Sequence, residues 1–312
     1  MVMNLEQLRG FVEVARLGHF TRASEHLHLA QPSLSRQIST LERELGAELF
    51  HRARGHISLT AAGEALLPRA QRMLAEADAI RDEMGELAGL RRGRVRLGAP
   101  PTLCISLVAE AISSFHAAHP NVDLHLTEGG SRLLVEQLAV GAVDIALITQ
   151  SDGPTPAGVS LTQIPLLAEE LVVISSAAAP PVTHGPSVSL AHLATLPLIA
   201  FDDSYELRAT MDAAFRDADL TPKLALEGAE MDAVLRFVER GVGVAVVPAM
   251  VLFERPTLRS ARLSHPAMSR TISLAHRSDV TPAVAVAAMR TVIVTTAAEV
   301  ARRDPAITSL ID

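Results

Sequence analysis

In the first fifty residues, apolar positions recur three and four residues apart, the spacing that places side chains on one face of a helix. The repeating residues are Leu5, Leu8, Phe11, Val12 and Ala15 in one stretch and Leu34, Ile38, Leu41 and Leu45 in a later one. Gly18 and Gly46 follow these stretches, where glycine commonly ends a helix. A shorter helix fits between them, and Thr21 is placed to cap its start. Three helices with a tight turn before the third predict a helix-turn-helix.

The third helix, which should begin at Pro32, presents a polar face opposite its apolar stripe. That face carries Ser33, Ser35, Arg36, Ser39, Thr40 and Arg43. Small hydroxyls let a helix lie deep in the major groove of DNA, and Arg36 can reach a guanine or a phosphate. A solvated helix surface explains the same residues equally well. Two extended pieces around the basic turn 51–56 then predict a wing, with Arg52 and Arg54 suited to phosphate or minor-groove contact.

A long helix should follow, over residues 61–90, because apolar residues there alternate four and three positions apart. They are Leu66, Ala70, Met73, Ala77, Ile80, Met84 and Leu87. This heptad seam is typical of helices that pair between two copies of a chain. The same stripe could instead pack on the chain's own small domain. We favour pairing, because charged residues flank the seam and the helix leaves a very small domain. Residues 89–93 should break the helix and form a hinge.

Beyond Gly93 the pattern changes to short apolar strands that alternate with helical stretches. Strands are expected at 95–97, 123–127, 144–148, 171–175, 198–200, 223–227, 244–247 and 271–275, and helices near 103–118, 131–140, 204–218, 230–240 and 283–302. Such alternation predicts an α/β domain with a parallel sheet. Gly241 and Gly243 should serve only a tight turn from helix to strand.

The amino-acid composition excludes several classes of protein. Apolar residues make up 48% of the 312, which allows a sizeable core, and the net charge is −7. Residues 1–93 contain 12 Arg and 12 acidic residues, so the negative charge belongs to the rest of the chain. A single cysteine excludes an internal disulfide and argues against a cysteine-based zinc site. We find no signal-like start and no apolar stretch long enough for a bilayer, so we expect a cytoplasmic protein without membrane contact.

The segment AQPSLSRQISTLERELGAELF, with FVEVARLGHFTRASEHLHL before it, is similar to the DNA-binding domain of LysR-type transcriptional regulators. A departure is His19, where that family often has a small capping residue. The resemblance implies a sequence-specific regulator that binds double-stranded promoter DNA as a homodimer, with pairing into a tetramer and contact with RNA polymerase. Together with the polar face, it predicts these DNA-contacting residues: Thr21, Gln31, Pro32, Ser33, Ser35, Arg36, Ser39, Arg52 and Arg54.

The resemblance extends to the rest of the chain and implies an effector domain like a periplasmic binding protein, with two subdomains. The expected domains are a winged helix-turn-helix at 1–60, a linker helix and hinge at 61–93, and an effector-binding domain at 94–312. Subdomain I would cover about 94–165 and 270–312, and subdomain II 166–269. Ligands of such sheets bind outside the carboxyl ends of the strands, where helix N-termini attract anions. The expected effector-binding residues are Pro101, Thr102, Ser131, Thr149, Phe201, Ser204, Glu230 and Met231.

Hydroxyls at three of these helix starts lead us to expect a small carboxylate or another polar metabolite as effector, although simple capping explains each hydroxyl alone. The family often has a charged residue near Thr149, so recognition here should be less ionic. Cys104 has no second cysteine to pair with, which argues against a peroxide-sensing switch and favours a small buried residue. His116 and His119 lack acidic partners for a metal. We expect no cofactor.

Three other classes of protein were weighed. An enzyme should show a phosphate loop, a nucleophile elbow or a zinc motif, and none is present. A transport solute-binding protein would need a signal peptide and would lack residues 1–90. A purely architectural DNA-binding protein would not need a cleft, and a ligand-induced change in its footprint would exclude it.

Overall fold

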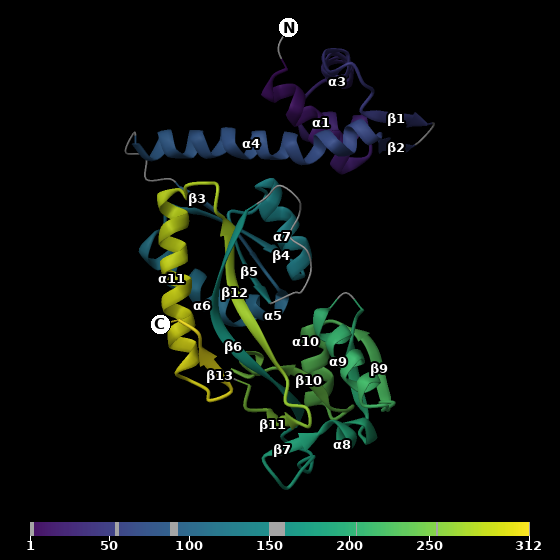
Figure 1. The fold of residues 1–312 in the computed structure, drawn as a ribbon, viewed down its shortest axis with the longest axis vertical. Coiled ribbons are helices and arrows are strands. Elements are labelled where there is room, and N and C mark those ends of the chain that lie inside the picture. Colours follow the sequence, from purple (N-terminus) through teal and green to yellow (C-terminus); the bar gives the residue numbers. More distant parts are fainter. Residues whose placement is uncertain are drawn as a thin grey trace. The chain divides into compact units, whose positions relative to one another are not determined.

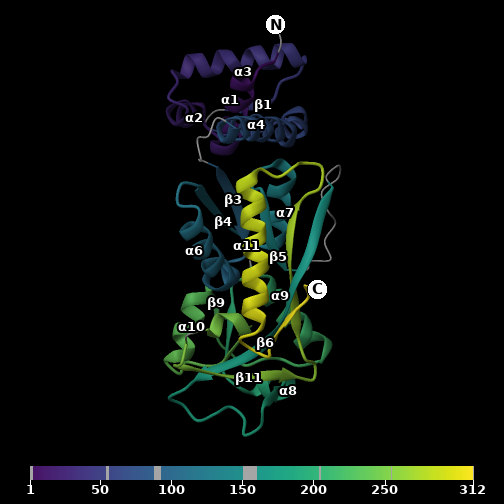
Figure 2. The same ribbon diagram turned by 90° about the vertical axis from the view of Figure 1, so that its left-hand side faces the viewer.

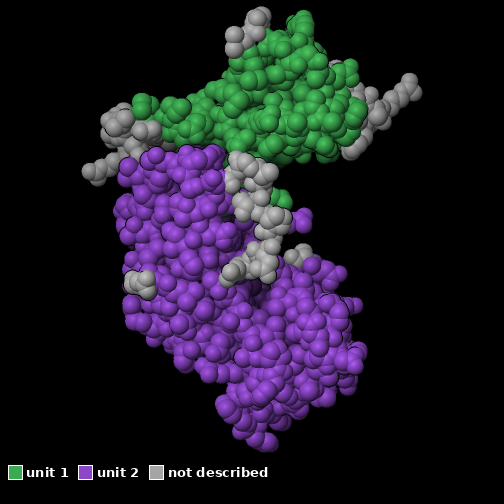
Figure 3. All heavy atoms as spheres, in the orientation of Figure 1, with its two compact units in different colours: residues 1–93, 136–143 green, residues 94–135, 144–312 purple. Residues whose placement is uncertain are grey.

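The computed structural model describes residues 3–53, 56–87, 93–149, 160–203, 205–253 and 255–311. The chain forms two compact units (Figure 3). One comprises residues 1–93 with 136–143, and the other comprises 94–135 with 144–312. The main division therefore falls at Gly93, and the rest of the predicted hinge, residues 89–92, lies outside the described residues.

The first unit contains the three predicted helices (Figure 1). They are α1 (Leu5–Leu17), α2 (Phe20–His26) and α3 (Gln31–Leu45). Their apolar stripes meet in one core, in which Phe11, Leu34 and Ile38 are fully buried. Gly18 and Gly46 end α1 and α3 in the left-handed region, with φ of 66° and 68°, as the sequence predicts. The helix-turn-helix is thus confirmed.

The start of α2 differs from the prediction. Its N-cap is His19, whose side chain makes no capping bond, and Thr21 lies inside the first turn. The prediction that Thr21 caps the helix was wrong, because α2 begins at Phe20 and not after Thr21. His28, at φ 53°, then makes the turn toward α3.

The predicted wing is present as two antiparallel strands, β1 (Phe50–Ala53) and β2 (His56–Leu59), with Phe50 opposite Leu59. Phe50 also packs against Phe11 of α1, with ring centroids 5.3 Å apart, so the wing is anchored to the helical core. Arg52 lies in β1, but its side chain and all of Arg54 lie outside the described part of the chain.

Helix α4 (Ala61–Leu87) is the predicted linker helix, and the structure divides its apolar seam in two. Leu66 and Ala70, at the start of the seam, pack into the core of their own unit. Further along, Met73, Ile80 and Met84 are 43%, 53% and 52% exposed. The start of the seam therefore packs on its own domain, and pairing between two copies through the exposed part stays a prediction. The side chain of Leu87 is outside the described set.

The second unit is built on a curled sheet with strand order β4-β3-β5-β12-β6-β11-β7 (Figure 1). The strands are β3 (Arg94–Ala99), β4 (Asp123–Glu128), β5 (Ile145–Thr149), β6 (Leu161–Ser176), β7 (Ser187–Ser189), β11 (Leu258–Ser264) and β12 (Ser269–Arg277). Strands β3, β4 and β5 are parallel, whereas β12 is antiparallel to β5 and to β6. The sheet is consequently mixed, and not parallel throughout as the sequence pattern suggested.

Strand β6 links the two ends of this unit because it pairs along its length with different partners. Its first part pairs with β12, and its last residues pair with β10 (Ala245–Pro248) and β11. Strand β13 (Ile307–Ser309) joins it in the middle. A separate small parallel pair is formed by β8 (Leu198–Phe201) and β9 (Leu224–Ala229). The sequence pattern missed β7, β11, β13 and the first half of β6.

Helices cover the sheets on both sides (Figure 2). They are α5 (Pro101–Leu103), α6 (Ala109–Ala118), α7 (Ser131–Val140), α8 (Leu190–Thr195), α9 (Glu206–Asp217), α10 (Met231–Glu239) and α11 (Val284–Ala301). A π-helical turn at Cys104–Val108 joins α5 to α6, and a 3₁₀ turn at Ala249–Leu252 follows β10. Helices α6 and α11 pack together, with Phe115 and Met289 fully buried in the main core. The predicted helices near 131–140, 230–240 and 283–302 are confirmed.

Two close glycines make the turn between α10 and β10, as the sequence predicts. Gly241 has φ 76°, which residues with a side chain rarely adopt. A Cβ on Gly243 would lie 2.3 Å from the Pro197 carbonyl oxygen, so only glycine fits there.

Two helical stretches, Pro101–Ala118 and Val284–Ala301, are long and apolar enough to be considered as membrane spans. Both supply fully buried side chains to the main core, including Leu107, Phe115 and Ile293. Packing on the chain's own sheet explains their apolar character without a bilayer.

Candidate functional sites

The polar face of α3 is accessible, as DNA reading requires. Gln31, Pro32, Arg36 and Ser39 are exposed, and Ser33 and Ser35 are half-buried. Leu34, Ile38 and Leu41 hold the opposite face in the core. Arg36 Nε donates to the Pro32 carbonyl at 3.2 Å, which folds its guanidinium along the start of the helix. Thr21, on α2, is also exposed.

The second unit contains a pocket of about 300 Å³ at the carboxyl ends of its parallel strands. Its lining residues are Pro100, Pro101, Thr102, Glu128, Gly129, Gly130, Thr149, Tyr205, Glu206, Leu207, Glu230 and Arg270. They follow β3, β4 and β5, begin α9 and α10, or lie on β12. This volume is at the lower end of the range for small-molecule sites.

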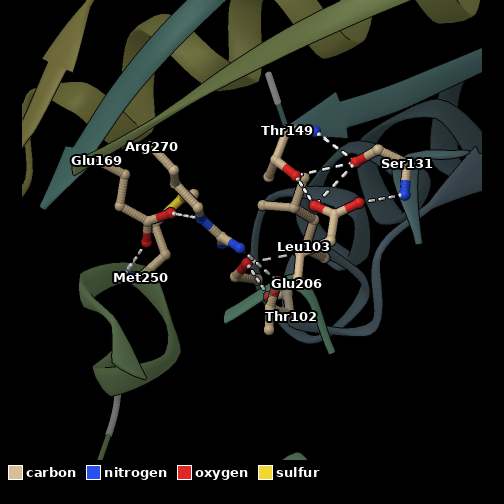
Figure 4. Close-up of polar contacts among 9 residues, drawn as sticks. Thr102, Leu103, Ser131, Thr149, Glu169, Glu206, Met250 and Arg270 are labelled. Atoms are coloured by element: carbon tan, nitrogen blue, oxygen red, sulfur yellow. Dashed lines mark hydrogen bonds and ion pairs between the residues drawn. The ribbon is translucent and has the colours of Figure 1, made fainter. Parts of the chain in front are cut away.

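The carboxylate of Glu206 lies against the start of α7 (Figure 4). It accepts hydrogen bonds from Ser131 N at 2.8 Å, from Ser131 Oγ at 3.2 Å and from the Thr149 hydroxyl. The Thr149 N–H in turn donates to Ser131 Oγ at 3.1 Å. A helix N-terminus favours negative charge, so this is the position in which the sequence led us to expect a ligand carboxylate. The chain fills it with its own side chain.

Tyr205 and Glu230 form a second cluster at the pocket. The Tyr205 hydroxyl donates to Glu230 at 2.5 Å and accepts from Met231 N at 3.4 Å. Its ring stacks on Phe201, with centroids 5.2 Å apart. Burial, the bond to Glu230 and the charges of Glu230 and Glu128 raise the pKa of Tyr205 to about 12. The phenol is therefore neutral at physiological pH.

Arg270, on β12, is the cation of the pocket, and a buried acid neutralises it (Figure 4). Its Nε donates to Glu169 at 2.9 Å, and its Nη1 donates to the Thr102 hydroxyl at 3.0 Å. Glu169 is 0% exposed and also accepts from Met250 N at 2.6 Å. Glu169 thus balances the charge of the guanidinium, while the buried Nη2 of Arg270 has no hydrogen-bond partner among the described residues.

Cys104 lies close to the pocket without belonging to its lining. Burial and the neighbouring charge of Glu128 raise the pKa of its thiol to about 12. A thiol with so high a pKa is a poor nucleophile. Cys104 is half-buried, and not fully buried as the sequence led us to expect.

The structure brings together four of the predicted effector-binding residues, Pro101, Thr102, Thr149 and Glu230, in the pocket lining. Ser131 is buried directly behind Glu206. Phe201 and Met231 are also buried, beneath Tyr205, and do not line the pocket. Ser204 lies outside the described residues.

Sequence reasoning missed Glu128, Tyr205, Glu206 and Arg270. Each is polar and adjacent to a predicted strand end or helix start, which is a signal that could have found them.

Comparison with known proteins agrees with both units. A family model described as "LysR substrate binding domain" matches residues 88–298, and one described as "Bacterial regulatory helix-turn-helix protein, lysR family" matches residues 5–64. The uncharacterized HTH-type transcriptional regulator YybE of Bacillus subtilis is 33% identical over 273 residues, which cover 88% of this chain and 92% of that protein. The transcriptional dual regulator GltC of the same organism is 30% identical over 274 residues, covering 87% and 90%.

Among solved structures, full-length OxyR from Pseudomonas aeruginosa is similar with a TM-score of 0.70 and 25% identity, and 97% of each chain is covered. The match therefore includes the helix-turn-helix, the linker helix and the two-part α/β unit. The chain belongs to the LysR family of bacterial helix-turn-helix transcriptional regulators.

Proposed function

We propose that α3 reads promoter DNA in the major groove and that occupancy of the pocket modulates this binding. The chain is, like its family, a DNA-binding transcriptional regulator with an effector-binding domain. The observation that carries the proposal for α3 is its exposed row of Gln31, Arg36 and Ser39 opposite a fully apolar buried face. An inserted helix needs this arrangement, since its outer side chains must reach base edges while its inner face stays packed.

DNA reading is tested by Ser35→Ala and Arg36→Ala, with Arg81→Ala on the exposed side of α4 as a matched loss of charge. Affinity for the chain's own promoter region is measured by fluorescence anisotropy at fixed salt. A base-contacting arginine contributes about 1–3 kcal/mol, so Arg36→Ala should bind roughly 5-fold to 150-fold more weakly. Unchanged affinity and selectivity in both α3 variants would remove this helix as the reader.

The same proposal places the effector in the pocket between the strand ends and the starts of α9 and α10. A thermal-shift screen of metabolites on the full chain should find it, because a ligand that binds only the folded state raises the melting temperature. Gly130→Met should then abolish the response, since a Cβ at Gly130 meets only Glu206 Oε1, at 3.7 Å, and a longer side chain would enter the pocket. Ser131→Leu is a weaker test, because Ser131 is already buried.

For assembly, we propose a homodimer through the exposed part of the α4 seam, Met73, Ile80 and Met84. Three exposed apolar side chains at heptad spacing favour burial against a second copy. Pairing into a tetramer, contact with RNA polymerase and a cytoplasmic location complete the proposal. The division into 1–60, 61–93 and 94–312, with subdomains at 94–165 plus 270–312 and at 166–269, is retained as part of it.

A further inference from the structure

The pocket of the effector unit is lined by three carboxylates from three different elements. Glu128 ends β4, Glu206 begins α9 and Glu230 precedes α10. All three residues are exposed to water. Within the described part of the chain, their polar partners are neutral groups: the Cys104 thiol, the Ser131 and Thr149 donors, and the Tyr205 hydroxyl.

These acids are not explained by capping of their own helices. Glu230 is the N-cap residue of α10, but its side chain makes no capping bond there and accepts from Tyr205 instead. The Glu206 carboxylate bonds the start of α7, which lies 75 residues away in the sequence, and not the start of α9. Both side chains are therefore directed to the pocket at the expense of the usual stabilisation of a helix start.

An anionic ligand would meet two obstacles in this pocket. The helix start best suited to a carboxylate is already occupied by Glu206, which three donors hold in place. Among the described lining residues the cation is Arg270, whose Nε is paired with the fully buried Glu169, whereas its Nη2 has no hydrogen-bond partner. An incoming carboxylate would have to displace Glu206 from the start of α7 or compete with Glu169 for Arg270. It would then lie beside Glu128 and Glu230.

The neighbouring titratable groups report the same negative potential. The charge of Glu128 contributes to raising the pKa of both Cys104 and Tyr205, and Glu230 adds to it at Tyr205. Burial is the larger cause in each case, but the Coulombic contributions have the sign that an excess of negative charge requires.

We propose that the effector is a small cation, a metabolite that bears a primary ammonium group bound among Glu128, Glu206 and Glu230. An ammonium has three N–H donors and no acceptor, so three carboxylates from three elements satisfy it completely. The proposal rests on the proposed function, because it assigns the ligand class of the same effector pocket. The proposed cationic effector takes the place of the carboxylate-bearing effector that the helix starts alone suggested.

The test uses three matched four-carbon probes on the full chain: butane-1,4-diamine, butylamine and butanedioate. The chain has one Tyr and no Trp, so its ultraviolet emission reports Tyr205 in the pocket. Both amines should change this emission saturably and raise the melting temperature, whereas butanedioate at equal ionic strength should do neither. Binding of butanedioate alone, or of none of the three at millimolar concentration, overturns the proposal.

Variants locate the bound amine. Glu128→Gln and Glu230→Gln should each weaken binding of butane-1,4-diamine about 10-fold to 100-fold, the usual effect of losing one charge-assisted hydrogen bond. Glu299→Gln, at an exposed site on α11, removes the same charge outside the pocket and should leave the affinity unchanged. Equal losses in all three variants would mean a non-specific effect of net charge. A Glu206→Gln protein that gains affinity for butanedioate would mean that Glu206 only holds the place of an anionic effector.

Promoter binding in the same samples separates the ligand class from the function. If butane-1,4-diamine occupies the pocket but leaves the promoter footprint unchanged, the ligand class stands and the proposed coupling to DNA fails. If butanedioate changes the footprint, the proposed function stands and the cationic effector is wrong.

Discussion

The ion pair between Glu169 and Arg270 provides a quantitative test of what stabilises the effector unit, because one partner is entirely shielded from water. Glu169 is 0% exposed, and Arg270 is 17% exposed with its Nε 2.9 Å from the carboxylate. Arg270→Met removes the cation and keeps an apolar stem. Glu169 then retains only the Met250 N–H among the donors that the structure gives it. Removing one partner of a buried pair costs about 3–5 kcal/mol, because the remaining charge stays in a medium of low polarity.

We therefore expect the free energy of unfolding of this unit to fall by about 3–5 kcal/mol. In a unit of roughly 200 residues, 1 kcal/mol lowers the melting temperature by about 2–4 °C, so the loss should be about 6–20 °C. Urea unfolding of the full chain followed by Tyr205 emission is the assay, since this single tyrosine reports the effector unit alone. A lower midpoint with an unchanged slope gives the difference in stability.

Arg303→Met is the matched control, because Arg303 pairs with Glu110 at 2.6 Å on the surface, where both side chains are substantially exposed. Exposed pairs contribute about 0–1 kcal/mol. If Arg270→Met also costs less than about 1 kcal/mol, the reasoning from burial is refuted. The double variant Glu169→Leu with Arg270→Met should recover part of the loss, because it removes the carboxylate that lacks a partner.

Three further predictions concern the single tyrosine, the single cysteine and the exposed apolar seam of α4. Absorbance titration of the single tyrosine, Tyr205, should give a pKa of about 12 in the folded chain, and Glu230→Gln should lower this pKa. The contribution of the neutral phenol to the free energy of unfolding is present below about pH 10 and is lost as the pH rises to about 12. A measured pKa near 10 would contradict the structure. Cys104 should react with iodoacetamide at pH 8 roughly 1000-fold more slowly than a free cysteine, and ordinary reactivity that disappears on mutation of Cys104 would show that the thiol is not shielded. Ile80→Glu should shift the full chain toward monomer in sedimentation, whereas Arg81→Glu at an exposed site on the same helix should not, and equal behaviour of the two would mean that the seam does not pair.

The helices and the helix-turn-helix could be predicted from the sequence because their signals are local. The apolar spacing of α1 and α3, the glycines that end them and the proline in the first turn of α3 all lie within one or two turns of the feature they specify. The wing is equally local, since β1 and β2 lie close together in the sequence. The start of α2 was misjudged, because His19 gives no capping signal, and the short helix α8 (Leu190–Thr195) was not predicted.

The long strand β6 could not be predicted in full for a physical reason. Its first part contains Pro165 and the acids Glu169 and Glu170, which disrupt the apolar pattern on which strand prediction depends. Glu169 is buried only because Arg270 neutralises it from 101 positions away. Sequence periodicity carries no information about such a distant partner, and the strand predicted there covered only residues 171–175.

The position of Glu206 shows the same limit at the functional site. The sequence pointed to the start of α7 as suited to an anion, and in the structure the hydroxyls of Ser131 and Thr149 meet the carboxylate of Glu206 there. Which carboxylate it is depends on tertiary structure, because Glu206 comes from α9. Its contact joins the part of the unit that carries β5 to the part that carries β8 and α9. A ligand that draws this carboxylate away changes the balance between the two parts, and it can shift their equilibrium only by its difference in affinity for the two arrangements. The proposed ammonium would meet that condition if it bound Glu128 and Glu230 in both arrangements and Glu206 in only one of them.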